Sequence, residues 1–412
     1  MMIKFVVQAA ALVGALASVA IVPPRPVGQG GAGYLFVVRG ETLHVYSRDN
    51  THAARASVPI TDVEGEGSFI YPAKHTSSFG YLGDEMVTLT ATAEGEAHRV
   101  AYSTGTGAGA ERSTFDPRLL APLDRDLDAA VGERTFPAAL LREALSQARS
   151  FLPEPGDKVV NEALRGVQLF DGKVTPGEKA NGYVYAANGT LAMFFRSDAL
   201  YDKGLHVHSQ HLSMVLAFLG KAGQTVTVRD GASMTFLSDE QGRVLGWAHS
   251  AKKHEAFSYY SLDQDVWVAK VAASPVLHAL KYVRSEMDKR TKVRVQYDAE
   301  GKQMTFGAAG GTEKVTSFPV PVEMGTDHAA WSASFNLDHL LELFTGIRGN
   351  ELEVRAYMVA PSEARPRGLV MLRTVDEFVL SPEGKIVGGS GVEILPEGAS
   401  RCRVTRFLPS ME

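Results

Sequence analysis

The chain has 412 residues and a single cysteine, Cys402, which excludes an internal disulfide and any cysteine-based zinc cluster. Its 45% apolar and 22% charged residues are typical of a globular protein with buried cores, and the length suits about two to four domains. The net charge of −5 at pH 7 does not indicate nucleic-acid binding, although a basic stripe on one face would not show in the bulk charge.

An almost uncharged apolar run covers residues 5–22. Leu12, Leu16 and Val19 recur in it at helical spacing, so we predict a core helix over residues 5–21. A secretory signal peptide is the alternative, because the alanines around position 17 have the spacing of a cleavage site. No other run approaches the ~18 apolar residues that a membrane-spanning helix needs, so we expect no membrane span.

The same succession of strand, helix, glycine-containing turn and strand occurs three times, over residues 68–89, 205–228 and 331–354. Each copy is preceded by an apolar stretch with helical spacing, over residues 5–21, 136–152 and 268–283. Self-similarity at a nearly fixed period indicates structural repeats. We therefore predict three domains, residues 1–132, 133–264 and 265–412, each built of helix, strands, helix and strands.

Alternating apolar residues predict strands between and after these helices. The segments are residues 34–38, 42–47, 53–60, 87–93 and 99–104, then 164–170, 183–186, 191–195 and 232–237, then 292–297, 304–308, 352–357, 368–373, 377–380 and 401–407. Turns are expected at Asn188 with Gly189 and at Asp230 with Gly231.

Residues 116–128 contain two prolines and several aspartates, which favours a linker. Asp124, Asp126 and Asp128 resemble the opening of a calcium-binding loop, but the glycine and the terminal glutamate that such a loop requires are missing. We therefore expect these aspartates to lie on a solvated linker.

No catalytic motif is present: the sequence lacks Gly-x-Ser-x-Gly, His-Glu-x-x-His, a Walker lysine and the Rossmann glycine fingerprint. His206, His208 and His211 have a spacing that could hold a metal, yet no further ligand lies near them in the sequence. We expect polar or DNA-facing imidazoles instead. The chain is therefore predicted to be a binding protein with no active site, metal or cofactor.

The order of the segments resembles the bacterial-type DNA polymerase sliding clamp, the polymerase III beta subunit family. The stretch KFVVQAAALVGAL is similar to the family's N-terminal strand and first helix, GETLHVYSRDNTHAARASVPI to its first hairpin, and STFDPRLLAPLDRD to its linker. LRGVQLF and YAANGTLAM resemble segments of its second domain, and FNLDHLLELFTGIRGNELEVRAYM and RVTRFLP resemble its last helix and terminal strand. These seven matches occur in the correct order over essentially the whole chain.

The resemblance implies an α+β fold of three DNA-clamp domains, each with two helices packed on antiparallel sheets, and a homodimeric ring of two chains joined head to tail. Such a ring encloses double-stranded DNA and needs sequence-independent contacts from Lys and Arg to phosphates, so that it can slide. The candidates on or beside the helices are Arg25, Lys74, Arg142, Arg149, Lys221, Lys281, Arg284, Lys289, Arg290 and Arg348. Taken singly, each is equally well explained as part of a solvated helix face.

The family also binds short peptides of DNA polymerases and clamp loaders in an apolar pocket between its second and third domains. Carried over by position, this pocket comprises Leu164, Ala187, Gly189, Thr190, Leu191, Phe407, Leu408, Pro409 and Met411. An apolar pocket that holds an extended peptide suits modest, exchangeable affinity. Leu164 and Leu191 are also consistent with ordinary strand-core residues.

Two features depart from the family's pattern. Asn188 and Thr190 replace the usual Asp and His of the middle motif, and the tail ends on Glu412 where the family has a basic and an apolar residue. These departures suggest a divergent member, and a phage-encoded one fits them.

The predicted function is a DNA sliding clamp and processivity factor, in the cytoplasm, where a single cysteine suits the reducing conditions. It would tether a DNA polymerase after placement by a clamp loader. One alternative is a clamp-fold protein that tethers RNA polymerase or a repair enzyme, which the altered pocket favours. The other is a secreted repeat protein, which requires the N-terminal run to be a signal peptide.

Overall fold

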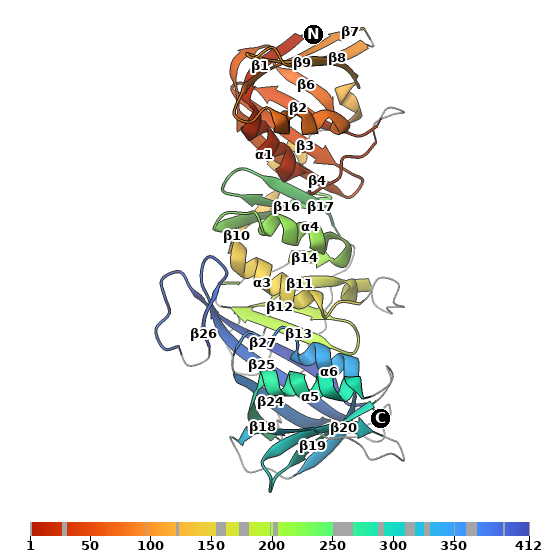
Figure 1. Ribbon diagram of the computed structural model, residues 1–412, viewed down its shortest axis with the longest axis vertical. Coiled ribbons are helices and arrows are strands. Elements are labelled where there is room, and N and C mark those ends of the chain that lie inside the picture. Colours follow the sequence, from red (N-terminus) through yellow and green to blue (C-terminus); the bar gives the residue numbers. More distant parts are fainter. Residues whose placement is uncertain are drawn as a thin grey trace. The chain divides into compact units, whose positions relative to one another are not determined.

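The structure, a computed structural model, describes residues 2–26, 31–95, 97–120, 123–153, 162–172, 181–197, 199–200, 205–249, 267–286, 292–309, 318–324, 330–349, 351–359, 369–389 and 392–411 (Figure 1). The chain forms two compact units, Met1–Ala138 with Ser213–His249 and Ala139–Leu212 with Ser250–Glu412. The second third of the chain therefore contributes to both units.

The first unit contains a five-stranded sheet, with the order β5-β1-β7-β8-β9, and an eight-stranded sheet, with the order β10-β15-β16-β17-β4-β3-β2-β6. The strands are β1 (Met2–Gln8), β2 (Gly33–Arg39), β3 (Thr42–Arg48), β4 (His52–Pro59), β5 (Thr61–Glu64), β6 (Gly67–Pro72), β7 (Met86–Glu94), β8 (Ala97–Thr104), β9 (Gly109–Thr114), β10 (Val131–Pro137), β15 (Thr225–Asp230), β16 (Met234–Asp239) and β17 (Val244–Ala248). Helix α1 (Ala9–Val19) packs on the 3₁₀ helix η1 (Ala73–Tyr81) and on β3 and β4. The short helices η2 (Pro117–Leu119) and α2 (Asp124–Asp128) follow β9.

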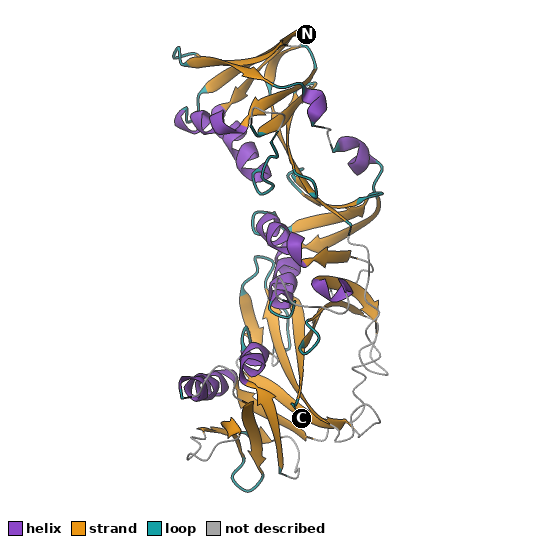
Figure 2. Cartoon of the chain, turned by 90° about the vertical axis from the view of Figure 1, so that its right-hand side faces the viewer, coloured by secondary structure: helices purple, strands orange, loops and turns teal. Residues whose placement is uncertain are grey.

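The second unit contains a ten-stranded sheet, with the order β14-β11-β12-β13-β27-β25-β24-β18-β22 and β26 on β25, and a four-stranded sheet, with the order β21-β20-β19-β23. Its strands are β11 (Gly166–Gly172), β12 (Asn181–Ala187), β13 (Ala192–Ser197), β14 (Leu205–His208), β18 (Trp267–Ala272), β19 (Lys292–Asp298), β20 (Gln303–Ala309), β21 (Phe318–Pro321), β22 (Glu323–Met324), β23 (Trp331–Asn336), β24 (Glu351–Val359), β25 (Leu369–Leu380), β26 (Ile386–Gly389) and β27 (Ser400–Pro409). The helices are α3 (Ala138–Arg149), η3 (Glu162–Arg165), α5 (Ala273–Ser285) and α6 (Leu337–Phe344), while α4 (Ser209–Leu219) begins in this unit and ends in the first. Within each unit the helices lie against the sheets (Figure 2).

One pairing scheme occurs three times along the chain. The strand before the first helix of each repeat pairs with the strand after the second helix: β1 with β7, β10 with β15, and β18 with β24. The first strand after the first helix pairs with the strand before the second helix: β2 with β6, β11 with β14, and β19 with β23. This recurrence confirms the three-repeat α+β fold. The domain limits at residues 132 and 264 stay a prediction.

Neighbouring repeats are joined by strand pairing. We call the last strand of each repeat its closing strand (β9, β17 and β27), and the third strand after its first helix its receiving strand (β4, β13 and β21). The closing strand β17 pairs with β4 within the first unit, and β27 pairs with β13 within the second. In the described part of the chain, β9 and β21 each lie at the edge of a sheet.

Each repeat opens on a strand where the sequence predicts the start of a helix, and this part of the prediction is wrong. Helices predicted from residues 5, 136 and 268 begin at Ala9, Ala138 and Ala273, after β1, β10 and β18. In β1, the buried residues Ile3, Phe5 and Val7 alternate with more exposed neighbours, which is the period of a strand. Leu12 and Val19 are buried in α1, so the core helix is confirmed from Ala9 onward. The apolar run considered as a signal peptide therefore builds β1 and the core of the first unit.

The expectation of a solvated linker is wrong for Asp124, which begins α2 and is only 4% exposed. Its carboxylate accepts hydrogen bonds from Tyr46 and Arg55, and Arg39 lies 2.7 Å from it. Burial by itself would raise the pKa of Asp124, but these hydrogen bonds and the two arginine charges outweigh it and hold the pKa below its ordinary value. Three linker leucines join a core that spans the β4–β17 junction: Leu120, Leu123 and Leu127 with Ala53, Phe236 and Val244.

Candidate nucleic-acid interface and partner pocket

Helix α3 presents two arginines on its outer face. Ala144, Leu145 and Ala148 are buried, whereas Arg142 and Arg149 are exposed and lie about two turns apart on one side of the helix. Neither arginine makes an ion pair with another residue of the described chain. Their charges therefore face solvent without compensation.

Helix α5 carries Lys281 and Arg284 on its exposed side. Arg284 lies 3.4 Å from Asp338 at the start of α6, so its charge is partly compensated. Lys281 lines a cavity of about 490 Å³ together with Arg348, from the turn after α6. Arg348 in turn donates to Glu143, with Nε–Oε1 at 2.9 Å. The fold thus brings two predicted cations to one cavity, and one of them already has a carboxylate partner.

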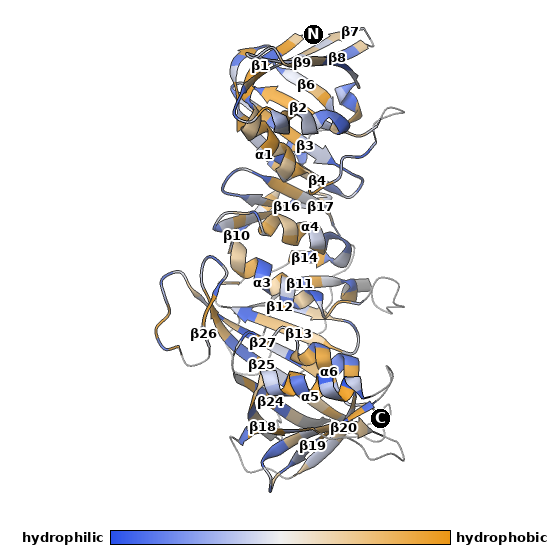
Figure 3. Ribbon diagram, in the orientation of Figure 1, coloured by the Kyte–Doolittle hydropathy of each residue, from blue (hydrophilic) through white to orange (hydrophobic). Residues whose placement is uncertain are grey.

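The first repeat contributes few cations from its helices. The exposed positions of α1 are small and uncharged, Ala10, Gly14 and Ala17, and the helix is coloured apolar along most of its length in Figure 3. Lys74 lies exposed on η1, as the sequence predicts for a helix-borne cation. Repeat 1 therefore offers a weaker basic surface than α3 does.

Two other predicted cations have structural partners. Arg25 donates to the backbone oxygen of Leu119 at 3.1 Å. Lys221 donates to the oxygen of Ala17 at 3.3 Å, near the C-terminus of α1, where a positive charge is favourable. Lys289 and Arg290 lie outside the described residues.

The turn between β12 and β13 lies beside the end of β27, as the predicted peptide pocket requires. Ala192 of β13 pairs with Phe407 of β27. The Oδ1 of Asn188 accepts from the backbone N–H groups of Thr190 and Leu191 at 3.0 and 2.8 Å, and Gly189 has φ +94°, which favours glycine. Asn188 therefore closes the turn by the same bonds that an aspartate would accept.

Much of the predicted pocket is covered in the structure. Four of its residues are 0–3% exposed: Ala187, Leu191, Phe407 and Leu408. Leu164 and Pro409 are half-buried, whereas Gly189, Thr190 and Met411 are exposed. The N–H of Met411 donates to the oxygen of Ser334 at 2.7 Å, which holds the tail against β23. The assignment of these residues to a peptide pocket stays a prediction.

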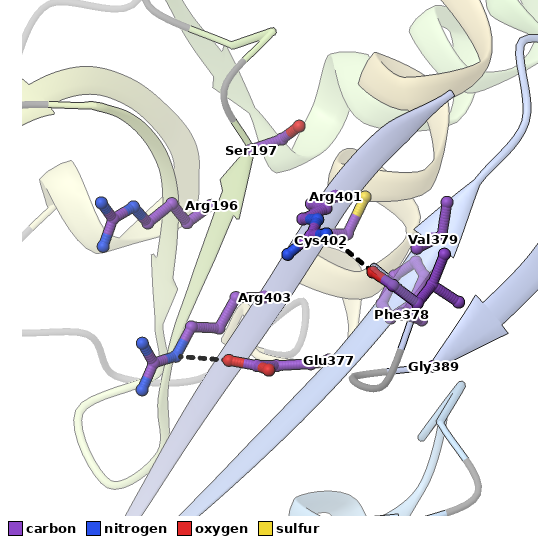
Figure 4. Close-up of a pocket in the computed structure, with 10 residues that line it drawn as sticks. Arg196, Ser197, Glu377, Phe378, Val379, Gly389, Arg401, Cys402 and Arg403 are labelled. Carbon is purple, nitrogen blue, oxygen red and sulfur yellow. Dashed lines mark hydrogen bonds and ion pairs between the residues drawn. The ribbon is translucent and has the colours of Figure 1, made fainter. Parts of the chain in front are cut away.

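A cavity of about 390 Å³ lies at the other end of the β13–β27 pair (Figure 4). Arginines from β13 and β27 line it, but they have local partners: Arg403 lies 3.5 Å from Glu377, and Arg401 donates to backbone oxygens after β26. Cys402 also lines the cavity, and burial raises the pKa of its thiol to about 12. A thiol with so high a pKa is unreactive at neutral pH.

The three histidines do not converge as metal ligands would. The rings of His208 and His211 are 6.0 Å apart, and His211 is buried beside Gln210. His206 faces Gly166 on β11, where a Cβ atom would lie 2.2 Å from its Nε2. Among the described residues, no group of three or more potential ligands has the geometry of a metal site. None of the described helices combines the length and the apolar character that crossing a bilayer requires.

A buried arginine that the sequence does not single out connects α3 to β27. Arg406 is 0% exposed, and its Nη2 donates to Gln147 Oε1 at 2.9 Å and to the oxygen of Gly346 at 3.2 Å. Burial lowers the pKa of Arg406 to about 10, while the charge of Asp376 favours the protonated form. Asp376, also 0% exposed, accepts from the N–H groups that follow α6, those of Arg348 and Gly349, at 2.7 Å each.

This three-repeat architecture is the fold of the bacterial DNA sliding clamps. The beta sliding clamp of Caulobacter crescentus is similar with a TM-score of 0.70 and 14% identity, over 100% of this chain and 99% of that one. The DNA polymerase III subunit beta of Pseudomonas aeruginosa gives 0.72 and 14%, over 99% and 100%. The beta subunit from Thermotoga maritima gives 0.66 and 14%, over 100% and 99%. No protein-family model and no curated protein matches the sequence. These matches confirm the predicted fold. At so low a sequence identity they support the fold alone.

Proposed function

We propose that the chain is a DNA sliding clamp, a processivity factor without catalytic activity that two copies close around double-stranded DNA. The observation that carries this proposal is how neighbouring repeats join: two closing strands, β17 and β27, each pair with the receiving strand of the preceding repeat. The remaining closing strand, β9, and the remaining receiving strand, β21, lie at sheet edges. In a head-to-tail arrangement of two copies, β9 of each chain pairs with β21 of the other, and the two junctions close a homodimeric ring.

The ring would hold DNA through its helices. Arg142, Arg149 and Lys281 are exposed without ion-pair partners among the described residues, and Lys74 adds a cation from the first repeat. Contacts from such side chains to phosphates are independent of base sequence and release counterions, so the ring could slide and its affinity would fall with salt. Arg284 and Arg348 would contribute less, because Asp338 and Glu143 already compensate them.

The exposed rim beside β13 and β27 would bind a peptide of a DNA polymerase and, during ring placement, of a clamp loader. This rim consists of the exposed Gly189, Thr190 and Met411 and the half-buried Pro409, next to the buried residues Leu191 and Phe407. A second candidate function is a clamp that tethers RNA polymerase or a repair enzyme. The burial of four pocket residues and the replacement of the family's usual Asp and His by Asn188 and Thr190 favour it, because they change the surface that a replicative peptide would meet. In either case the protein would act where the genome lies, in the cytoplasm of a bacterial cell.

The test measures the solution mass by light scattering, together with retention on one plasmid in its nicked-circular and linearised forms. We expect a dimer of twice 44.4 kDa that stays on circles and leaves linear DNA from its ends. Equal retention on both forms would mean ordinary electrostatic binding, and a monomer without retention would refute the clamp. Pull-down with immobilised peptides of a polymerase or an RNA polymerase then separates the two candidate functions.

A further inference from the structure

The receiving strand β21, which lies at a sheet edge among the described strands, carries two prolines with a defined orientation. The N–H of Val322 donates to the oxygen of Lys302 at 3.0 Å, which places residues 318, 320 and 322 in the positions that bond to β20. Pro319 and Pro321 alternate with these, so their backbone groups point away from the sheet, and both residues are exposed. Because proline has no N–H, the edge presents carbonyl acceptors but no donors at these two positions.

The closing strand β9, at the edge of its sheet, differs from β21 because its outward positions contain no proline. The N–H of Thr104 donates to the oxygen of Ala108 at 2.8 Å, which fixes the phase of the β8–β9 pair. By the same alternation, Gly109, Glu111 and Ser113 direct their backbone groups away from β8, and all three residues are exposed. Each of them presents both an N–H donor and a carbonyl acceptor.

The receiving strands inside the chain have no such restriction. The residues of β4 that pair with β17 are 52–55, and those of β13 that pair with β27 are 192–197. Neither set contains a proline, so both internal junctions are able to exchange hydrogen bonds in both directions. The alternating prolines thus occur on the one receiving strand that no closing strand pairs with in the described part of the chain.

We infer that two copies of this chain join through one-way hydrogen bonds, in which N–H groups of β9 donate to the carbonyls of Pro319 and Pro321 without return bonds. This inference rests on the proposed function, since it takes the second copy as the partner. Two β21 edges have no donors for one another at these positions, so the prolines favour the head-to-tail pairing of β9 with β21. The missing return bonds make this junction weaker than a full ladder, and the ring opens there.

The test restores or removes donors one strand at a time and measures the monomer–dimer constant by analytical ultracentrifugation. The double variant Pro319→Val with Pro321→Val gains two N–H groups, and we expect the dissociation constant to fall about tenfold to a hundredfold. Ser113→Pro removes a donor from β9 without touching its bonds to β8, and we expect dimerisation to weaken by about tenfold. The matched controls are Pro396→Val in the exposed segment after β26, and Ser113→Ala, and both should leave the constant unchanged.

Retention on nicked-circular plasmid separates this inference from the proposed function. If the natural chain dimerises and stays on circles while the proline double variant binds no more tightly, the one-way junction is wrong and the clamp stands. If the double variant dimerises more tightly and its residence on circles lengthens, both proposals are supported. If the natural chain and every variant are monomers that no circle retains, both are wrong.

Discussion

The two internal junctions join neighbouring repeats by the same strand pairing but stabilise it with opposite charges. At the β4–β17 junction the buried charge is a carboxylate, Asp124, which the linker brings to Arg55 of the receiving strand and to Arg39. At the β13–β27 junction the buried charge on the paired strands is a guanidinium, Arg406, which belongs to the closing strand itself, reaches Gln147 of α3 and has the buried carboxylate of Asp376 as its neighbouring charge.

The difference lies in how each charge meets solvent. The side chain of Arg39 is 52% exposed, so part of the first network is screened by water, and its carboxylate loses its charge in acid. Arg406 is 0% exposed, and with a pKa of about 10 it stays charged at neutral pH. The first junction is therefore expected to respond to pH, and the second to respond mainly to the loss of its partners.

The largest effect is expected from breaking the second junction. Arg406→Ala leaves Gln147 without its donor and Asp376 without its neighbouring charge, which should destabilise the junction by about 3–5 kcal/mol. Alkylation of Cys402 under native conditions measures this, because its buried thiol reacts only when the β27 region opens. We expect the rate to rise about 10²- to 10⁴-fold.

Arg403→Ala is the matched control on the same strand. Arg403 is about one-third exposed, and water screens its 3.5 Å ion pair with the partly exposed Glu377, so its removal should cost about 1 kcal/mol or less. Equal alkylation rates in the two variants would contradict the role of Arg406.

A smaller effect is expected at the first junction. Asp124→Asn keeps the shape of the side chain but removes the charge that faces Arg39 and Arg55, at a cost of about 2 kcal/mol. Trp247 of β17 is 1% exposed and reports on this junction by its fluorescence when Trp267 and Trp331 are replaced by Phe. Asp126→Asn, exposed on the same helix, should stay within about 0.5 kcal/mol of the parent in a urea titration. A comparable loss in both variants would mean that the buried ion pairs do not stabilise the junction.

The pH dependence of the two junctions should differ in a defined direction. The folded pKa of Asp124 lies below the ordinary carboxyl value, so its stabilisation is fully present above about pH 4 and is lost as the pH falls through the folded pKa. Urea titrations followed by Trp247 fluorescence should therefore show that the parent is more stable than Asp124→Asn at pH 5. This difference in the free energy of unfolding should shrink as the pH drops to about 2. A constant gap between the two proteins over this range would be inconsistent with a charged, paired Asp124.

The smallest effect on stability is expected from the outer face of α3. Arg142→Ala with Arg149→Ala leaves Gln147 and Arg406 in place, so both junctions should keep their stability. The binding constant for DNA should fall. The magnitude of the slope of log binding constant against log salt concentration should decrease by about 2, since each phosphate contact contributes about 0.9. Arg118→Ala with Arg125→Ala, two exposed linker arginines, is the charge-matched control. An equal change of slope in both pairs would indicate a diffuse charge effect without a DNA-facing helix.

The sequence by itself determined the features that depend on neighbouring residues. Alternation predicts β2, β3 and β4 closely, and Asn188 with Gly189 predicts the turn that the structure has, because a strand face and a tight turn are specified within a few residues. The threefold succession of helices and strands is likewise visible in the sequence, since each repeat encodes the same local pattern. The exposure of Arg142 and Arg149 follows from the spacing of the apolar residues of α3.

Only the tertiary structure decided which residues are shared between repeats. The strand β1 merges in the sequence with the apolar run of α1, and it becomes a strand because β7 provides its hydrogen-bond partner. Asp124 and Arg406 look like surface residues in the sequence, but their partners Tyr46 and Gln147 lie 78 and 259 residues away. The free energy of a buried charge depends on groups that folding brings to it, so no local pattern reveals whether water or a distant side chain will compensate it.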